Sequence, residues 1–204
     1  IYDRLVGSEM CIRDSPGTVF VVHTLDQTGT LNPLDADIII ERERSTNSNF
    51  GTTLACGFSP SGHGELLVGD TDQSSAMLFA PGTKGWLQSS YAKTDRAAML
   101  DSGTLGAALT MTDLDGDGWM DYFAGDSTHE GRGRVVAMYG PISGTIDMDT
   151  DADLTLSGVT GQGLGGALGA GDLDADGYPD LVVGSCATAA CPGEALIWFG
   201  GSAK

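Results

Sequence analysis

The stretch Asp113-Leu-Asp-Gly-Asp-Gly-Trp-Met-Asp121 decides the fold, because it returns almost unchanged as Asp172-Leu-Asp-Ala-Asp-Gly-Tyr-Pro-Asp180. In both copies acidic residues stand at positions 1, 3, 5 and 9, and glycine stands at position 6. Carboxylates at every second residue of a curled loop can converge on one hard cation such as Ca²⁺. The glycine permits the positive φ angle that a sharp turn requires. The alternative is a solvated acidic turn, but the repetition in matching contexts favours two calcium sites.

The residues after each loop identify its type. A helix–loop–helix calcium site would continue as a helix and would place Glu at position 12. Here the loops continue into the apolar or aromatic runs 122–125 and 181–184, each of which ends at glycine. Such runs are typical of short buried strands. We therefore expect each acidic loop to join two strands of a hairpin.

The composition of the chain favours an all-β repeat fold. It has 204 residues, of which 31 are Gly, and only 19% are charged. The formal net charge of −18 argues against nucleic acid and anionic membranes as partners, since these require Lys and Arg. No apolar run approaches the length of a transmembrane helix.

Residues 1–15 match nothing downstream, and they look like translated sequencing-adapter DNA. We expect a non-native leader here and assign it no fold; the alternative is a real but non-repetitive terminal segment. Setting Cys11 aside leaves three cysteines. Cys56 lies in an apolar stretch and is expected to be buried. Cys186 and Cys191 could bridge across a hairpin neck in an oxidising compartment, with two free thiols as the alternative.

Internal repeats predict the architecture. The glycine that opens each unit moves from Gly51 to Gly106 to Gly165, a period of roughly 55 to 60 residues. Each period contains four short apolar strands joined by turns, which predicts one blade of a β-propeller. We expect a partial β-propeller of about three and a half four-stranded blades. The half blade spans 16–44, two blades span 45–100 and 101–158, and an incomplete one spans 159–204.

The succession of Phe-Gly or Leu-Gly, the Asp-x-Asp-x-Asp-Gly-x-x-Asp loop and a Val-Val-Gly strand resembles the FG-GAP repeat. That repeat builds the propeller of integrin alpha chains and of integrin-like bacterial surface and secreted proteins. The resemblance covers residues 16–204, and it implies an extracellular or cell-surface protein that binds calcium between the first two strands of a blade. The ligands it implies are Asp113, Asp115, Asp117, Asp121 and the Trp119 carbonyl in one loop, and Asp172, Asp174, Asp176, Asp180 and the Tyr178 carbonyl in the other.

The first full unit departs from this pattern. Its loop, residues 58–65, is one residue shorter and keeps only Glu65 opposite Asp121 and Asp180. We therefore expect this blade to hold no metal. Two Ca²⁺ ions are expected in the chain as a whole.

No constellation of catalytic residues stands apart from the acidic loops. His23, His63 and His129 occupy unrelated positions of the repeat, and no Ser/His/Asp or Cys/His set accompanies them. We therefore expect the segment to be non-enzymatic. The alternatives are a calcium-stiffened structural spacer and a propeller accessory to a catalytic domain elsewhere in the parent protein.

A binding role is the expected function. The resemblance implies that a protein or glycan ligand sits on the face opposite calcium, and loops on a rigid scaffold commonly carry binding. The loops implied are residues 41–49, 70–74, 101–104, 126–132, 158–163 and 185–193. The rest of the propeller, in the parent chain, is a further expected partner.

Overall fold

The computed structural model describes residues 10–14, 17–22, 36–41, 49–59, 62–80, 90–92, 96–102, 105–185 and 193–201. Within these residues the regular structure consists of strands, apart from one short 3₁₀ turn, His129–Gly131. The predicted all-β class is confirmed. Cys186, Cys191 and His23 lie outside the described residues, so the predicted bridge stays a prediction.

The strands form four sheets, which we name by one of their strands. The β2 sheet contains β1 (Met10–Asp14), β2 (Thr18–Val22), β3 (Ile38–Glu41) and β7 (Ser90–Ala92). The β4 sheet contains β4 (Phe50–Phe58), β5 (Gly64–Asp70), β6 (Ser75–Phe79), β8 (Ala98–Asp101) and β12 (Gly144–Asp147). The β9 sheet contains β9 (Ala108–Thr112), β10 (Asp121–Asp126), β11 (Arg134–Met138) and β13 (Leu154–Ser157). The β14 sheet contains β14 (Leu164–Gly171), β15 (Asp180–Ser185) and β16 (Glu194–Trp198).

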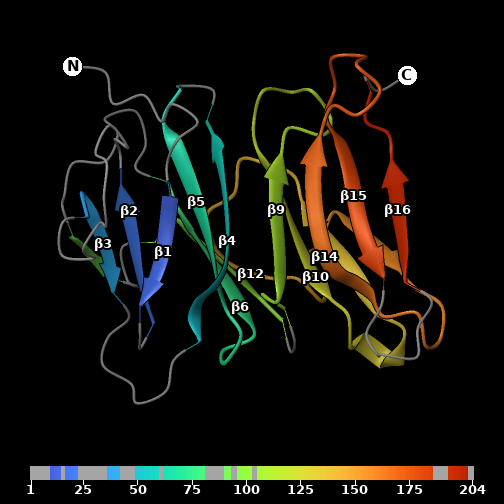
Figure 1. The fold of residues 1–204 in the computed structure, drawn as a ribbon, viewed down its shortest axis with the longest axis horizontal. Coiled ribbons are helices and arrows are strands. Elements are labelled where there is room, and N and C mark those ends of the chain that lie inside the picture. The colour runs from blue at the N-terminus through green and yellow to red at the C-terminus, as the bar shows by residue number, and fades with distance from the viewer. Residues whose placement is uncertain are drawn as a thin grey trace.

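The sheets stand side by side in sequence order, from the β2 sheet to the β14 sheet (Figure 1). In the β4 and β9 sheets, four successive repeat strands pair antiparallel in the order expected of one repeat unit, and β14–β16 repeat the first three. The strands expected from the repeat are therefore present in the described residues. The closure of a propeller and its number of blades go beyond these sheets and stay predictions.

Two strands leave their own unit and join the preceding sheet. β7 pairs with β3, and β12 pairs with β8, and both of these pairings are parallel. The repeat pattern did not predict either strand. Each lies in the connection between the third and fourth strands of its unit, and each extends the outer edge of the sheet before it.

The core lies between the sheets rather than inside any one of them. One cluster joins the β2 and β4 sheets around Val19, Phe50 and Phe79, and another joins the β9 and β14 sheets around Phe123 and Leu181. Middle strands such as β5 and β10 are buried along their whole length. Because neighbouring sheets cover both faces, their sequences read as unbroken apolar runs.

Two expectations differ from the structure. Residues 10–14, which we assigned no fold, form β1 and pair antiparallel with β2; the edge of β2 offers unpaired backbone groups to any extended chain. The expectation that Cys56 is buried is wrong, because its side chain is exposed on β4. A run of apolar letters does not show which face of a strand its neighbours cover.

Candidate metal centres

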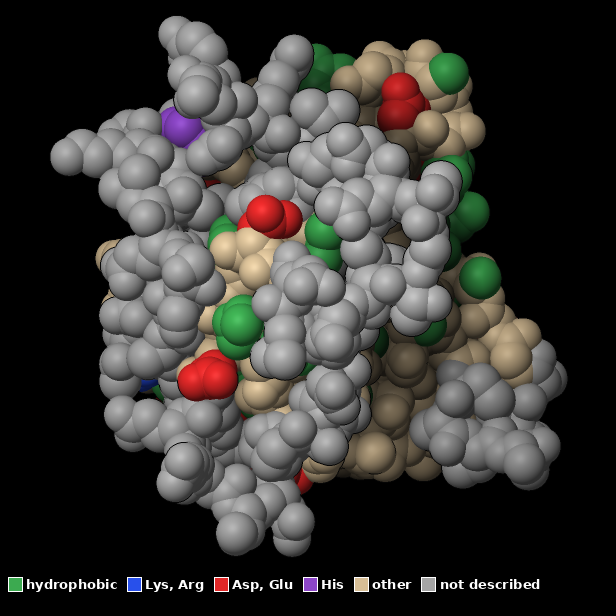
Figure 2. All heavy atoms as spheres, turned by 60° about the vertical axis from the view of Figure 1, so that its left-hand side comes forward, with side chains coloured by type: hydrophobic (Ala, Val, Ile, Leu, Met, Phe, Trp, Pro, Cys, Tyr) green, Lys and Arg blue, Asp and Glu red, His purple; other side chains and the backbone are tan. Residues whose placement is uncertain are grey.

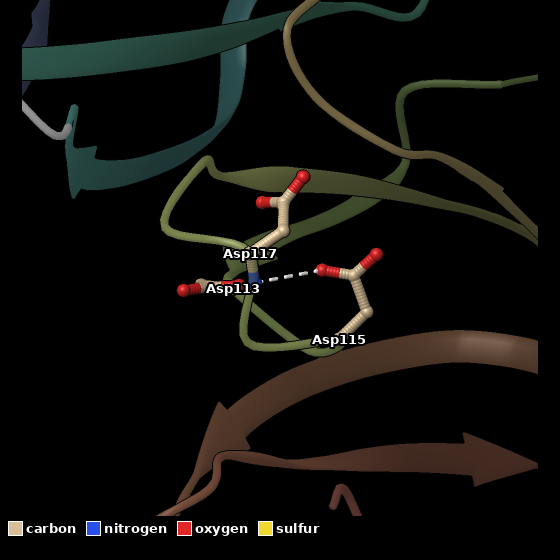
Figure 3. A group of neighbouring side chains, drawn as sticks. All are labelled: Asp113, Asp115 and Asp117. Atoms are coloured by element: carbon tan, nitrogen blue, oxygen red, sulfur yellow. Dashed lines mark hydrogen bonds between the residues drawn. The ribbon is translucent and has the colours of Figure 1, made fainter. Parts of the chain in front are cut away.

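Each acidic loop gathers three carboxylates at the end of a hairpin. The first loop joins β9 to β10, and the second joins β14 to β15. One carboxylate oxygen from each of Asp113, Asp115 and Asp117 lies within 4.8 Å of the other two. Figure 3 shows these three side chains around the loop. The same holds in the second loop for Asp172, Asp174 and Asp176. Positions 1, 3 and 5 of both predicted ligand sets are thus brought together.

Hydrogen bonds from the loop's own backbone hold these carboxylates. The backbone N–H of Gly118 donates to Asp113 Oδ2 at 2.9 Å, and the N–H of Asp117 donates to Asp115 Oδ1 at 3.1 Å. The N–H of Trp119 donates to Asp117 Oδ1 at 2.8 Å. In each carboxylate one oxygen therefore accepts a hydrogen bond from the loop backbone, and the remaining lone pairs can coordinate a cation.

The second loop repeats these contacts at equivalent atoms. Gly177 donates to Asp172 Oδ2 at 3.0 Å, Asp176 donates to Asp174 Oδ1 at 3.2 Å, and Tyr178 donates to Asp176 Oδ1 at 2.9 Å. The same backbone path therefore forms from two different sequences. The position-6 glycines have φ angles of +94° at Gly118 and +92° at Gly177, which confirms the expected positive φ.

The acids at position 9 of the loops, Asp121 and Asp180, are buried, unlike those at positions 1, 3 and 5. Asp121 is fully buried, and it accepts hydrogen bonds from the N–H groups of Leu114 at 2.8 Å and Gly140 at 3.2 Å. Asp180 accepts equivalent bonds from Leu173 and Gly200. These acids tie the loop to the chain that follows the third strand. A carboxylate oxygen has two lone pairs, so this bracing is compatible with the predicted ligand role.

Burial dominates the electrostatics of Asp121. Desolvation raises the pKa of its carboxyl group to about 6, although the backbone N–H groups of Leu114 and Gly140 act in the opposite direction. The nearby negative charge of Asp115 raises the pKa further. Burial and the neighbouring carboxylate thus both disfavour the charged form of Asp121.

The donor set suits a hard divalent cation. Asp113 Oδ1 is buried and has no hydrogen-bond partner in the structure, although Oδ2 of the same carboxylate is bonded to the loop. An orphaned buried anionic oxygen is costly unless something else coordinates it. All the grouped side-chain ligands are oxygens, as Ca²⁺ prefers. The residues of the first loop thus fit Ca²⁺, and the second loop offers the same geometry with greater exposure.

The short loop of the β4 sheet has other contacts. Glu65 is 8% exposed and accepts a hydrogen bond from the Tyr122 hydroxyl at 2.8 Å, so it faces β10. Burial raises the pKa of Glu65, and burial also raises the pKa of Tyr122. Among the described residues Glu65 joins no group of three acids. A metal-free loop here stays a prediction.

A third acidic segment, which the repeat search missed, lines a pocket at the opposite end of the sheets. The pocket has a volume of about 600 Å³ and lies between the β5–β6 turn, the end of β8 and the turn after β12. Its acidic lining comprises Asp72, Asp101, Asp147, Asp149 and Asp151. The signal was visible in the sequence as acids at every second position from 147 to 151.

Figure 2 shows the side of the molecule nearest the β2 sheet, where the described acidic side chains stand apart from one another rather than in one patch. His129 Nδ1 lies 3.5 Å from the buried Asp126, within the turn between β10 and β11. This contact places His129 within the hairpin turn, where it is half-buried beside Asp126.

The chain is 32% identical over 128 residues to phosphatidylinositol-glycan-specific phospholipase D of Mus musculus, covering 59% of the chain and 14% of that protein. It is 29% identical over 141 residues to integrin alpha pat-2 of Caenorhabditis briggsae, covering 63% of the chain and 11% of that protein. The resemblance to integrin alpha chains is confirmed. No family model matches the chain.

The bovine phosphatidylinositol-glycan-specific phospholipase D is 38% identical over 91 residues, covering 40% of the chain. The chain spans between 11% and 14% of the length of these curated relatives. In the part of the chain that the structure describes, no helix is long and apolar enough to cross a membrane.

Proposed function

We propose that this chain is a calcium-binding propeller segment of an extracellular or cell-surface protein, and that it binds a protein or glycan partner without catalysing a reaction. The observation that carries the proposal is the pair of acidic loops, in which the same backbone hydrogen bonds hold three carboxylates within 4.8 Å of one another. The similarity to an integrin alpha chain supports the same function.

In this proposal calcium stabilises the fold. At an effective dielectric near 20, two carboxylates about 4 Å apart repel by roughly 4 kcal/mol, an upper value for loops that can open. Asp113, Asp115 and Asp117 would hold the ion, with Asp121 and the Trp119 carbonyl completing the set; Asp172, Asp174, Asp176, Asp180 and the Tyr178 carbonyl would do so in the second loop. A bound divalent cation offsets the repulsion, and its binding free energy adds to the free energy of unfolding. Loops of this kind suit millimolar extracellular calcium.

The acidic pocket supports the proposal that a partner binds at the end of the sheets opposite the two calcium loops. It is built by the turns 70–74 and 101–102, which belong to the loops expected to bind, together with residues 145–151. Five aspartates favour a partner that presents basic groups, because like charges are repelled. A spacer would not require such a pocket. Loss of partner capture in the double variant Asp147→Asn/Asp151→Asn, but not in Asp37→Asn, an exposed aspartate outside the expected binding loops, would support this part of the proposal.

A second candidate function is that of a propeller accessory to a catalytic domain. It is favoured by the similarity to proteins named as phospholipase D, since the chain spans only a small share of their length. Activity of the full-length parent that falls when the acidic loops are changed would favour it over adhesion.

Terbium luminescence tests the calcium part of the proposal. Tb³⁺ occupies calcium sites and emits when a nearby indole is excited, and Trp119 lies in the first loop. We expect sensitised emission that Ca²⁺ competes away and that Asp115→Ala or Trp119→Phe strongly reduces. Equal emission from the native chain and from Asp115→Ala would contradict a site in this loop.

A further inference from the structure

The two acidic loops are in contact through one side chain. The ring of Tyr178, at position 7 of the second loop, lies against Gly116, at position 4 of the first loop. A Cβ built on Gly116 would lie 3.1 Å from Cε1 and 3.5 Å from Cδ1 of that ring. Gly116 stands between Asp115 and Asp117, two of the three grouped carboxylates of the first loop. A residue of one candidate metal centre thus packs directly on the backbone of the other.

The residue at position 4 differs between the two loops in a way that this contact explains. Gly116 and its equivalent Ala175 both have a positive φ, of +75° and +62°, so the backbone conformation alone does not demand glycine. Ala175 is exposed. At Gly116 a methyl group would be crowded by the Tyr178 ring, so the smallest residue stands where the neighbouring loop makes its contact. Gly116 is therefore part of an interface between the loops.

The position of the Tyr178 ring depends on the conformation of the second loop. The backbone N–H of Tyr178 donates to Asp176 Oδ1 at 2.9 Å. Pro179 follows, and a residue before proline is restricted to extended conformations. A Cβ on Gly200 would lie 3.5 Å from Tyr178 Cβ, so the chain after β16 limits movement on that side. Because Asp176 is one of the grouped carboxylates, a rearrangement of that group also moves the ring.

A second contact links the same two hairpins. The side chain of Leu114, at position 2 of the first loop, packs on the apolar cluster that includes Leu181 of β15, the residue after Asp180. The backbone N–H of Leu114 donates to Asp121 Oδ2 at 2.8 Å. The strands beneath the loops are also in contact, because β14 packs against β9 and β10. The first loop is thus held against the second hairpin at both its second and its fourth position.

We propose that calcium binding at the two loops is positively cooperative, and that the Tyr178 ring transmits the coupling. This inference rests on the proposed calcium function. Without metal, repulsion among its carboxylates opens the second loop, and the ring no longer holds the backbone of the first loop at Gly116. An ion in the second loop fixes the ring there, so the first loop loses less conformational freedom when it binds its own ion. Because coupling is reciprocal, an ion in the first loop strengthens binding in the second equally.

Electrostatics acts in the opposite direction. An ion in one loop neutralises charge that would otherwise attract an ion to the other loop. Interactions between exposed charges are screened beyond about 8 Å at physiological ionic strength, and the grouped acids of the second loop are exposed. A packing contact between a ring and the backbone is not screened. The cooperativity should therefore increase as the NaCl concentration is raised, while the overall affinity for calcium falls.

Calorimetric titration of the chelator-treated chain with Ca²⁺ at physiological ionic strength measures the coupling. We expect the native chain to bind its ions with a Hill coefficient above one. Tyr178→Ala keeps the backbone carbonyl and every carboxylate, so it should bind as many ions as the native chain but with a Hill coefficient near one. Trp119→Ala is the matched control, because Trp119 has the same position in the first loop and its side chain is 42% exposed. The control should keep the native cooperativity.

A thermodynamic cycle assigns the coupling to this ring. Asp174→Ala disables the second loop, and the first loop should then bind its ion at least about threefold more weakly than the native midpoint. In the Tyr178→Ala background, Asp174→Ala should leave the affinity of the first loop unchanged. Protection of β10 and β15 from amide hydrogen exchange in calcium shows that each variant is folded. If Asp174→Ala loses that protection, the comparison of Tyr178→Ala with Trp119→Ala decides alone.

The outcomes separate the coupling from the calcium sites themselves. Ions that bind the native chain independently would overturn the coupling and leave the sites in place. Native cooperativity in Tyr178→Ala, or an equal effect of Asp174→Ala with and without the Tyr178 ring, would also overturn it. A native stoichiometry of zero would reject the calcium sites and the coupling together.

Discussion

Arg134 Nη2 lies 2.7 Å from Ser102 Oγ, and this buried contact joins β11 of the β9 sheet to the end of β8 in the β4 sheet. The guanidinium also donates to Asp149 in the turn after β12 and lies 3.8 Å from the buried Asp126. The hydrogen bond from Arg134 holds the pKa of Asp149 below its usual range. One side chain thus links two sheets and one wall of the acidic pocket.

Removal of this guanidinium should destabilise the protein. Arg134→Ala removes the guanidinium that lies 3.8 Å from the buried Asp126 and that binds Ser102 and Asp149, and we expect the free energy of unfolding to fall by about 3 kcal/mol. Arg132→Ala is the matched control, because Arg132 pairs with Glu130 at the surface and such pairs contribute about 0.5 kcal/mol or less. Urea unfolding at saturating calcium measures both. Equal effects of the two substitutions would contradict the role given to Arg134.

Glu65 should make the stability depend on pH. Burial raises its pKa above the ordinary value of 4.5, so the folded protein holds the proton at pH values where the unfolded chain releases it. The free energy of unfolding therefore falls as the pH rises from 4.5 through the folded-state pKa. Glu65→Gln keeps an acceptor for the Tyr122 hydroxyl and removes this loss. We expect the variant to gain melting temperature over the native protein at pH 7 to 8 but not at pH 4; an equal difference at both pH values would refute the assignment.

The repeated features were predictable from the sequence because local chemistry determines them. The alternating aspartates with Gly118 and Gly177 predict two loops with positive φ, and the apolar runs after them predict β10 and β15. The four strands of each unit were likewise predictable, because each is a short apolar run bounded by glycine or polar residues. Resemblance to a known family added the ligand positions, of which the structure brings together 1, 3 and 5 in each loop.

The features that were missed depend on tertiary pairing. β12 has no apolar run, and its parallel partner β8 lies far away in sequence, so periodicity could not find it. The pocket forms where β12 ends, so it was missed with that strand, although the spacing of Asp147, Asp149 and Asp151 was visible. The exposure of Cys56 likewise depends on which face of β4 a neighbour covers.

The glycine contacts between sheets yield a mutational test. A Cβ at Gly125 would meet the backbone of Gly165 in the next sheet, and backbone cannot move aside cheaply. Gly125→Ala should therefore lower the free energy of unfolding by about 1 to 3 kcal/mol. Gly169→Ala is the control, since nothing lies within 4 Å of its added Cβ. Thermal unfolding should leave the control near the native value, and tolerance of Gly125→Ala would show that the sheets are not in such close contact.

Calorimetric titration of chelator-treated protein with Ca²⁺ tests the central claim most directly. We predict two ions per chain, and one ion for each of Asp115→Ala and Asp174→Ala, with a lower melting temperature in calcium for both. Asp147→Ala removes the same charge from an acidic segment outside the loops and should leave two ions bound. A stoichiometry of zero in the native chain, or an unchanged stoichiometry of two in Asp115→Ala and Asp174→Ala, would contradict the account.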